Sequence, residues 1–185
     1  MSGGGVYDHI RNLVDRFVQE GLIALAPDLY HGKVTSRTDE AEMNALDWPA
    51  SMHILQRAVS FLNHPRSNGN IGLTGFCMGG ALSFAAACQV HDLSAFVPFY
   101  GIPPASEANY AKVHAPLAHF AKHDEWATVQ AASQIQNQLK AEHKEITLHV
   151  YDAQHAFMNN TRPDVYEPSS AKLAWKRTID FFRLA

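Results

Sequence analysis

Hydrophobic residues along the chain form two kinds of segment, which alternate from one end to the other. The first kind is a short, mostly apolar run, as expected for a strand that is covered by other elements. The second kind is longer and polar on one side, as where Ile10, Leu13, Val14, Phe17 and Val18 follow helical spacing. The predicted strands are Leu22–Asp28, Ile71–Thr74, Ser94–Tyr100, Pro116–Ala121 and Ile146–Tyr151. The predicted helices are Val6–Glu20, Trp48–Leu62, Ala81–Ala87, Thr128–Glu142 and Ser169–Phe182.

This alternation predicts a single α/β domain over residues 1–185, with a mostly parallel sheet and helices on both of its faces. No internal repeat or change of composition marks a second domain. The glycine-rich start, Met1–Gly5, is expected to be a loop or linker. The polar stretch from Tyr30 to about Asp47 is expected to leave the core.

Composition narrows the functional classes. The 185 residues are 46% hydrophobic and 18% charged, with a formal net charge of -3, which gives no electrostatic basis for binding nucleic acid or a membrane surface. No apolar run is long enough to span a bilayer, and no signal-like segment opens the chain. Two cysteines, Cys77 and Cys88, make no disulfide framework, so we expect a reducing, cytoplasmic compartment. The eleven histidines are scattered, and no metal site is predicted.

The stretch Gly75-Phe76-Cys77-Met78-Gly79-Gly80 joins a predicted strand to a predicted helix. A reactive residue flanked by glycines at such a junction is the form of a nucleophile elbow, with cysteine in place of serine. The glycines would let strand and helix pass closely, and the helix N-terminus would favour a thiolate. An inert, buried cysteine in an ordinary turn is the alternative.

Two further reactive residues follow later strands. Asp124 comes after the strand ending near Ala121, and His155 comes after the strand ending near Tyr151. Because the carboxyl ends of parallel strands meet at one edge of the sheet, these residues are expected beside Cys77. The order nucleophile, acid, histidine is that of the α/β hydrolases.

In this arrangement His155 would take the proton of the Cys77 thiol, and Asp124 would hold the imidazole in place. The backbone N–H of Met78 would be one oxyanion-hole donor. Taken alone, Asp124 could instead cap the next helix, and His155 could be a polar loop residue. Cys88, in the middle of a helix, is interpreted as a core residue.

Three aromatic residues near the same edge, Tyr100, Trp126 and Phe157, are candidate apolar substrate contacts. Each of them could equally well be part of the core.

At this point the sequence resembles the dienelactone hydrolase family. The resemblance rests on Leu25–Tyr30, Gly72–Ala81, Tyr100-Gly101, the Asp124 segment and His155–Phe157, and it runs along nearly the whole chain. It implies an α/β-hydrolase fold and hydrolysis of small-molecule esters or lactones by a Cys77–Asp124–His155 triad. It also implies that no metal or organic cofactor takes part.

The chain departs from that family at two places. Family members carry three more strands before the first helix, and the third lies between the counterparts of Leu22–Asp28 and Ile71–Thr74. The sheet is therefore expected to be truncated or to close differently, for example in a homo-oligomer, and the second oxyanion amide would map near Gly3. The family's substrate-binding arginine, four residues after the histidine, corresponds to Asn159 here. We therefore expect ester or lactone hydrolysis, but not specifically the dienelactone substrate.

Three alternative functions remain open. A thioesterase or other carboxylesterase could use the same triad. A truncated remnant could retain the triad and serve as a binding or assembly partner. Cys77 could also be a redox sensor, although the sequence contains no evident resolving cysteine.

Overall fold

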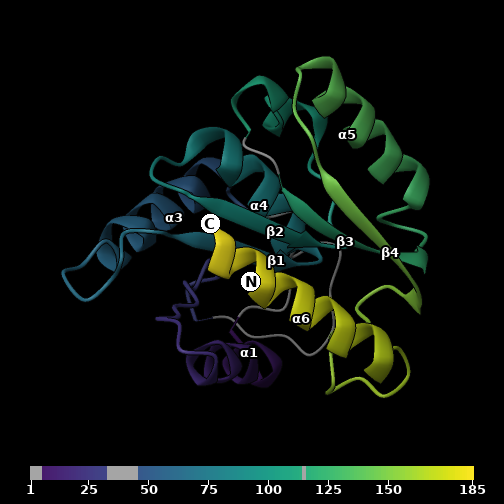
Figure 1. Ribbon diagram of the computed structural model, residues 1–185, viewed down its shortest axis with the longest axis horizontal. Coiled ribbons are helices and arrows are strands. Elements are labelled where there is room, and N and C mark those ends of the chain that lie inside the picture. Colours follow the sequence, from purple (N-terminus) through teal and green to yellow (C-terminus); the bar gives the residue numbers. More distant parts are fainter. Residues whose placement is uncertain (1–5, 33–45, 114–115) are drawn as a thin grey trace.

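The computed structural model describes residues 6–32, 46–113 and 116–185. At its centre is a four-stranded, fully parallel sheet in the order β1-β2-β3-β4 (Figure 1). The strands are β1 (Gly72–Phe76), β2 (Ala95–Phe99), β3 (Leu117–His123) and β4 (Thr147–Gln154). The α/β fold predicted from the alternation of segments is confirmed.

Helices cover both faces of the sheet. The helix α6 crosses one face with α1 beside it, and α3, α4 and α5 lie on the other (Figure 1). Their bounds are α1 (Asp8–Gln19), α3 (Trp48–Leu62), α4 (Met78–Gln89), α5 (Val129–Ala141) and α6 (Pro168–Leu184). Two short 3-10 turns, η1 (Ala105–Glu107) and η2 (Tyr110–Lys112), lie between β2 and β3. None of the helices in the described ranges combines the length and apolar character needed to cross a membrane.

The helix boundaries follow local chemistry. The Asp47 carboxylate accepts a hydrogen bond from the Ala50 N–H at the start of α3, and Thr128 accepts one from Ala131 at the start of α5. Gly21, with φ of +85°, follows the last turn of α1, where a left-handed residue ends a helix most easily. The hydrophobic stripe of α1 buries Ile10, Leu13 and Phe17 as its spacing predicts.

The most deeply buried strand is β2, in which all five residues are buried. It pairs with β1 from Gly72↔Ala95 to Phe76↔Phe99, and with β3 at Phe99↔His119. This strand therefore joins the elbow segment to the half of the sheet that carries Asp124 and His155.

One predicted strand is wrong. Leu22–Asp28 contains no strand residue, and the side chains of Ile23 and Leu25 are 58% and 42% exposed. An apolar run becomes a strand only when a neighbouring backbone pairs with it. Here an open groove separates Leu22–Pro27 from β1, and among the described residues β1 pairs with β2 alone. We call the space between β1 and Leu22–Pro27 the edge groove.

Candidate active site

The elbow is a single strained residue between strand and helix. Cys77 lies between Phe76, the last residue of β1, and Met78, the first of α4, with φ of 57° and ψ of -122°. A non-glycine residue with positive φ costs about 1–3 kcal/mol unless its surroundings hold it. The Cys77 N–H donates to the Phe99 carbonyl at 3.1 Å, and the Cys77 carbonyl accepts from the Gly80 N–H at 2.8 Å.

Glycines make this turn possible through close approach. A Cβ on Gly75 would lie 1.9 Å from the Gly79 carbonyl oxygen, and one on Gly80 would lie 2.4 Å from the Phe99 carbonyl oxygen. Gly101, after β2, would place a Cβ 2.5 Å from the Cys77 carbonyl oxygen. The steric role predicted for Gly75 is thus confirmed. Our interpretation of the sequence missed the equivalent role of Gly101, which the strand end just before it could have indicated.

Asp124 follows directly after β3, which runs two residues further than predicted. Its side chain is fully buried. One carboxylate oxygen accepts from the backbone N–H groups of Trp126 and Ala127, at 2.9 and 2.8 Å. The other lies 2.6 Å from Nδ1 of His155. Asp124 is not the cap of α5, because Thr128 fills that position.

The carboxylate form of Asp124 is stabilised despite its burial. Burial alone would raise the pKa of Asp124, but the hydrogen bond and charge of His155 and the two backbone donors lower it overall. Asp124 is therefore an acceptor, and the imidazole N–H donates to it.

His155 follows β4, which extends to Gln154. Besides its bond to Asp124, it lies near enough to Cys77 for that side chain to affect its pKa. Burial acts to lower the pKa of His155, but the hydrogen bond to Asp124 and the interactions with Cys77 outweigh this and raise the pKa to about 9. The site thus favours a protonated imidazole next to sulfur, which is the partner that a thiolate needs.

The three residues predicted from separate strand ends therefore lie together: His155 is hydrogen-bonded to Asp124 and is influenced electrostatically by Cys77. Met78 is the first residue of α4, where backbone N–H groups have no partner within the helix. Its role as an oxyanion donor stays a prediction, and Gly3 lies outside the described residues.

The candidate apolar contacts differ in position. Trp126 is 46% exposed and packs edge-on against His155, with ring centroids 5.5 Å apart, so it lies at the rim of the site. Tyr100 is buried and packs edge-on against the His155 ring, with ring centroids 5.0 Å apart. Phe157 is fully buried and packs on Tyr100 and Tyr151, at 5.5 and 5.0 Å. A role of each in binding substrate stays a prediction.

Tyr100 has an unusual backbone as well, with φ of 35°. Its N–H donates to the His119 carbonyl at 2.7 Å. Burial raises the pKa of Tyr100 well above its ordinary value, and the nearby Cys77 acts in the same direction. The phenol consequently stays neutral beside the thiol.

Asn159 is buried and joins two parts of the chain. Its side-chain oxygen accepts from the N–H and the hydroxyl of Thr161, and its Nδ2 donates to the Tyr7 hydroxyl at 3.3 Å. Our interpretation of the sequence did not find this link from the loop after His155 to the start of α1. Arg162, three residues further on, pairs with Asp164.

No group of three or more histidine, cysteine or acidic residues in the described ranges is arranged to hold a metal ion. Both cysteines are free thiols, and Cys88 donates to the Phe84 carbonyl at 3.2 Å from within α4.

Comparison with known proteins places this geometry in context. The chain is 35% identical to the protein usf of Aquifex pyrophilus and 31% identical to a carboxymethylenebutenolidase of Pseudomonas putida. The alignments cover 95% and 96% of this chain, and 80% of each relative. A crystal structure of a Klebsiella pneumoniae protein assigned to the dienelactone hydrolases superposes with a TM-score of 0.88 at 25% identity, over 100% of this chain and 84% of that one.

The sequence pattern of the dienelactone hydrolase family matches residues 2–185. The parallel sheet with helices on both faces agrees with that match and with the superposed structure. The chain therefore belongs to the dienelactone hydrolase family.

Proposed function

We propose that this protein hydrolyses small carboxylic esters or lactones, with Cys77 as nucleophile, His155 as acid and base, and Asp124 as the residue that orients His155. The observation that carries the proposal is the 2.6 Å hydrogen bond from His155 to the buried Asp124 carboxylate, with the same imidazole close enough to the elbow thiol for Cys77 to raise its pKa. Family membership and the printed activity of the Pseudomonas relative, a carboxymethylenebutenolidase, support the same class of reaction.

In the first half of the reaction the Cys77 thiolate attacks the carbonyl carbon of the substrate. A C–S bond forms, and the π electrons of the carbonyl move to its oxygen. The Met78 N–H, at the positive end of α4, would stabilise this oxyanion. The C–O bond to the leaving group then breaks, and His155 protonates the departing oxygen. The product is a thioester on Cys77.

In the second half His155, now neutral, removes a proton from water, and the oxygen of that water attacks the thioester carbonyl. The C–S bond breaks, the acid leaves, and the thiolate returns beside the protonated imidazole. With a lactone the leaving oxygen stays attached to the acyl group, so one ring-opened hydroxy acid is released.

We also propose that the protein works in a reducing compartment. Cys77 must remain a thiol for this chemistry, and its conversion to a sulfenic acid or disulfide would remove the nucleophile.

The test uses p-nitrophenyl acetate with the unaltered chain, Cys77→Ala and Cys88→Ala. We expect hydrolysis to vanish with Cys77→Ala and to persist with Cys88→Ala, which removes the other buried thiol. Mass spectrometry of rapidly quenched enzyme should show one acetyl group on the peptide containing Cys77. Equal rates for the unaltered chain and Cys77→Ala, at matched folding, would refute the proposal.

A further inference from the structure

A row of aromatic rings crosses the sheet on the face that α6 covers (Figure 1). Each strand contributes one ring, and the four residues are in register: Phe76, Phe99, His119 and His149. From one strand to the next the ring centroids are 4.6, 4.4 and 5.8 Å apart. The row begins directly before Cys77 and ends on β4, the strand that leads to His155.

This row passes the place where the two halves of the sheet meet. The half formed by β1 and β2 carries Cys77, and the half formed by β3 and β4 carries Asp124 and His155. Within each half the strands pair at several successive positions. Among the described residues, β2 and β3 are in register at the single pair Phe99↔His119. The alignment of thiol and imidazole therefore depends on how these two residues meet.

The backbone at this pair reaches the elbow. The Phe99 carbonyl accepts from the Cys77 N–H at 3.1 Å, and the His119 carbonyl accepts from the Tyr100 N–H at 2.7 Å. Phe99 consequently lies between the elbow, which its carbonyl holds, and the His119 ring, on which its own ring packs. A shift of the His119 ring would reach Cys77 through one residue.

Hydrogen bonds fix both the position and the tautomer of the His119 ring. The Thr178 hydroxyl donates to the Ala174 carbonyl at 2.9 Å, so its oxygen accepts from Nε2–H of His119 at 3.0 Å. Nδ1 then accepts from the Tyr151 hydroxyl at 2.8 Å, and the Tyr151 oxygen accepts from Arg177 at 3.1 Å. Burial also holds the pKa of His119 well below its ordinary value. The ring is therefore neutral, with a partner on each nitrogen.

We propose that His119 is a positioning residue for the hydrolysis proposed above. Its ring, held by Thr178 of α6 and Tyr151 of β4, keeps Phe99 in place and thereby holds the Cys77 thiol against the His155 imidazole. His119 does not touch the reacting atoms. The inference rests on the proposed function and adds to it the residue that aligns the two halves of the site.

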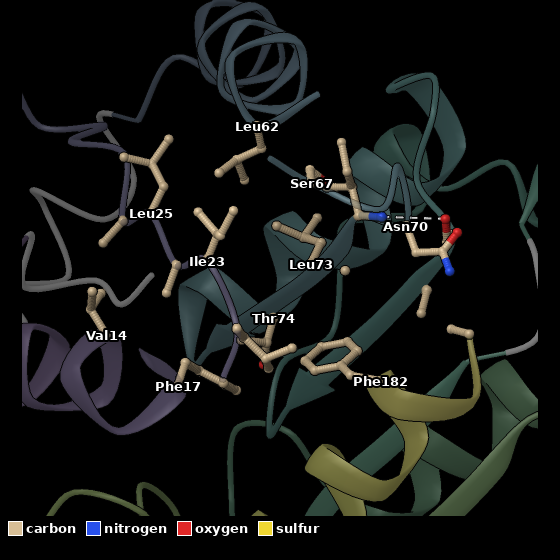
Figure 2. Close-up of a pocket in the computed structure, with 18 of the residues that line it drawn as sticks. Val14, Phe17, Ile23, Leu25, Leu62, Ser67, Asn70, Leu73, Thr74 and Phe182 are labelled. Carbon is tan, nitrogen blue, oxygen red and sulfur yellow. Dashed lines mark hydrogen bonds between the residues drawn. The ribbon is translucent and has the colours of Figure 1, made fainter. Parts of the chain in front are cut away.

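The test compares two threonine-to-valine variants with p-nitrophenyl acetate as substrate. Thr178→Val removes the oxygen that accepts from His119. Thr74→Val is the matched control, because Thr74, at the edge groove (Figure 2), donates to the Val97 carbonyl at 2.8 Å within the first half of the sheet. We expect kcat to fall about 10- to 100-fold in Thr178→Val with KM unchanged. Thr74→Val should keep the kcat of the unaltered chain, although it lies closer to Cys77 in the sequence.

Tyr151→Phe is the second variant. It removes the donor to Nδ1 of His119 but keeps the ring that packs on Phe157. We expect its kcat to fall in the same way as that of Thr178→Val. Circular dichroism at the assay temperature would establish that each variant is folded.

Two further measurements separate misalignment from loss of structure. The low-field proton resonance of the hydrogen bond between His155 and Asp124 should persist in both variants, because these residues belong to the same half of the sheet. Alkylation of Cys77 by iodoacetamide near neutral pH, followed by mass spectrometry of its peptide, should slow about tenfold, since the thiolate would lose its imidazolium partner.

The proposal has clear ways to fail. Equal losses of kcat in Thr178→Val and Thr74→Val would show that any lost hydrogen bond in this region has the same effect. Loss of the low-field resonance together with kcat would indicate a collapsed site. Unchanged alkylation in Thr178→Val and Tyr151→Phe would also overturn the role of His119. If the unaltered chain hydrolyses no ester, the proposed function fails, but the alkylation rates still decide whether His119 aligns Cys77 with His155.

Discussion

At the scale of single residues, the buried His9 and the partly exposed His155 respond to pH in opposite directions. The pKa of His155 is raised to about 9 because its hydrogen bond to Asp124 and its interactions with Cys77 outweigh its burial. Its contribution to stability is therefore present below about pH 6.5, and is lost as the pH rises towards 9. Burial lowers the pKa of His9 to about 4, against a smaller opposing effect of Asn160. The effect of His9 on the free energy of unfolding is consequently seen at acidic pH.

The first prediction concerns Asp124. Replacing it with Asn keeps the shape but removes the charge that holds the imidazole, and we expect kcat/KM for an activated ester to fall on the order of 1000-fold or more. The control is Asp152→Asn, because Asp152 bonds His123 at 2.8 Å in an exposed carboxylate–histidine pair on the same two strands. We expect the control to retain activity. A similar loss in both variants would contradict a specific role for Asp124.

The second prediction concerns His9. The unfolded chain takes up a proton near pH 6.5, whereas the folded chain takes it up only near pH 4, so stability should fall as the pH decreases between these values. In His9→Gln this decrease should be smaller by up to about 3 kcal/mol, measured by urea unfolding at pH 7 and pH 4. The exposed His91→Gln variant serves as control and should follow the unaltered chain. Identical curves for all three proteins would show that His9 does not resist protonation.

At the scale of elements, close contacts between glycine and backbone hold the end of β1, the start of α4 and the segment after β2 together. Gly101 would place a Cβ 2.3 Å from the Ala81 nitrogen, inside the first turn of α4. Backbone atoms cannot move aside as the end of a flexible side chain can. The elbow geometry thus depends on a residue outside the elbow motif.

The third prediction follows from that contact. We expect Gly101→Ala to destabilise the fold by several kcal/mol, or to move the elbow and abolish esterase activity. Gly69→Ala is the control, because Gly69 has positive φ but open space around it. That change should cost only about 1 kcal/mol and leave activity intact. Thermal unfolding and activity of the two variants would test whether crowding, and not backbone strain, decides the outcome.

The sequence was sufficient to predict those elements whose formation has a local cause. The spacing in α1, the glycines around Cys77 and the polar residues after β3 and β4 each have a local cause, so the order of strands and the grouping of Cys77, Asp124 and His155 were predictable. The absence of a strand at Leu22–Asp28 was not predictable, because strand formation depends on a pairing partner that no local pattern reports. The link from Asn159 to Tyr7 joins residues far apart in the chain, and it was missed for the same reason.

At the scale of the whole molecule, two hydrophobic clusters meet at the sheet. One includes Phe84, Phe99 and Phe120, the other includes Leu55, Met78 and Leu82, and Leu73 packs against both. This shared boundary indicates that the described residues unfold as one cooperative unit.

The fourth prediction is therefore a single unfolding transition. We expect urea curves from tryptophan fluorescence and from far-ultraviolet circular dichroism to coincide. The first probe reports on the three tryptophans, among them Trp175, which packs on Phe17 with ring centroids 4.5 Å apart, and the second reports on all helices. Separate midpoints would mean that the two clusters unfold independently.

The parallel sheet also has a consequence for synthesis on the ribosome. Thr74 and its bonded neighbour Val97 are 23 residues apart, and Asp124 and His155 are 31 apart, so no two adjacent strands can form a local hairpin. Folding must wait for each intervening helix, which slows it relative to a chain with local pairings. His155 leaves the ribosome after all four strands. A nascent chain therefore exposes its Cys77 thiol to the surrounding solution well before the His155 imidazole, its proposed partner, has been made.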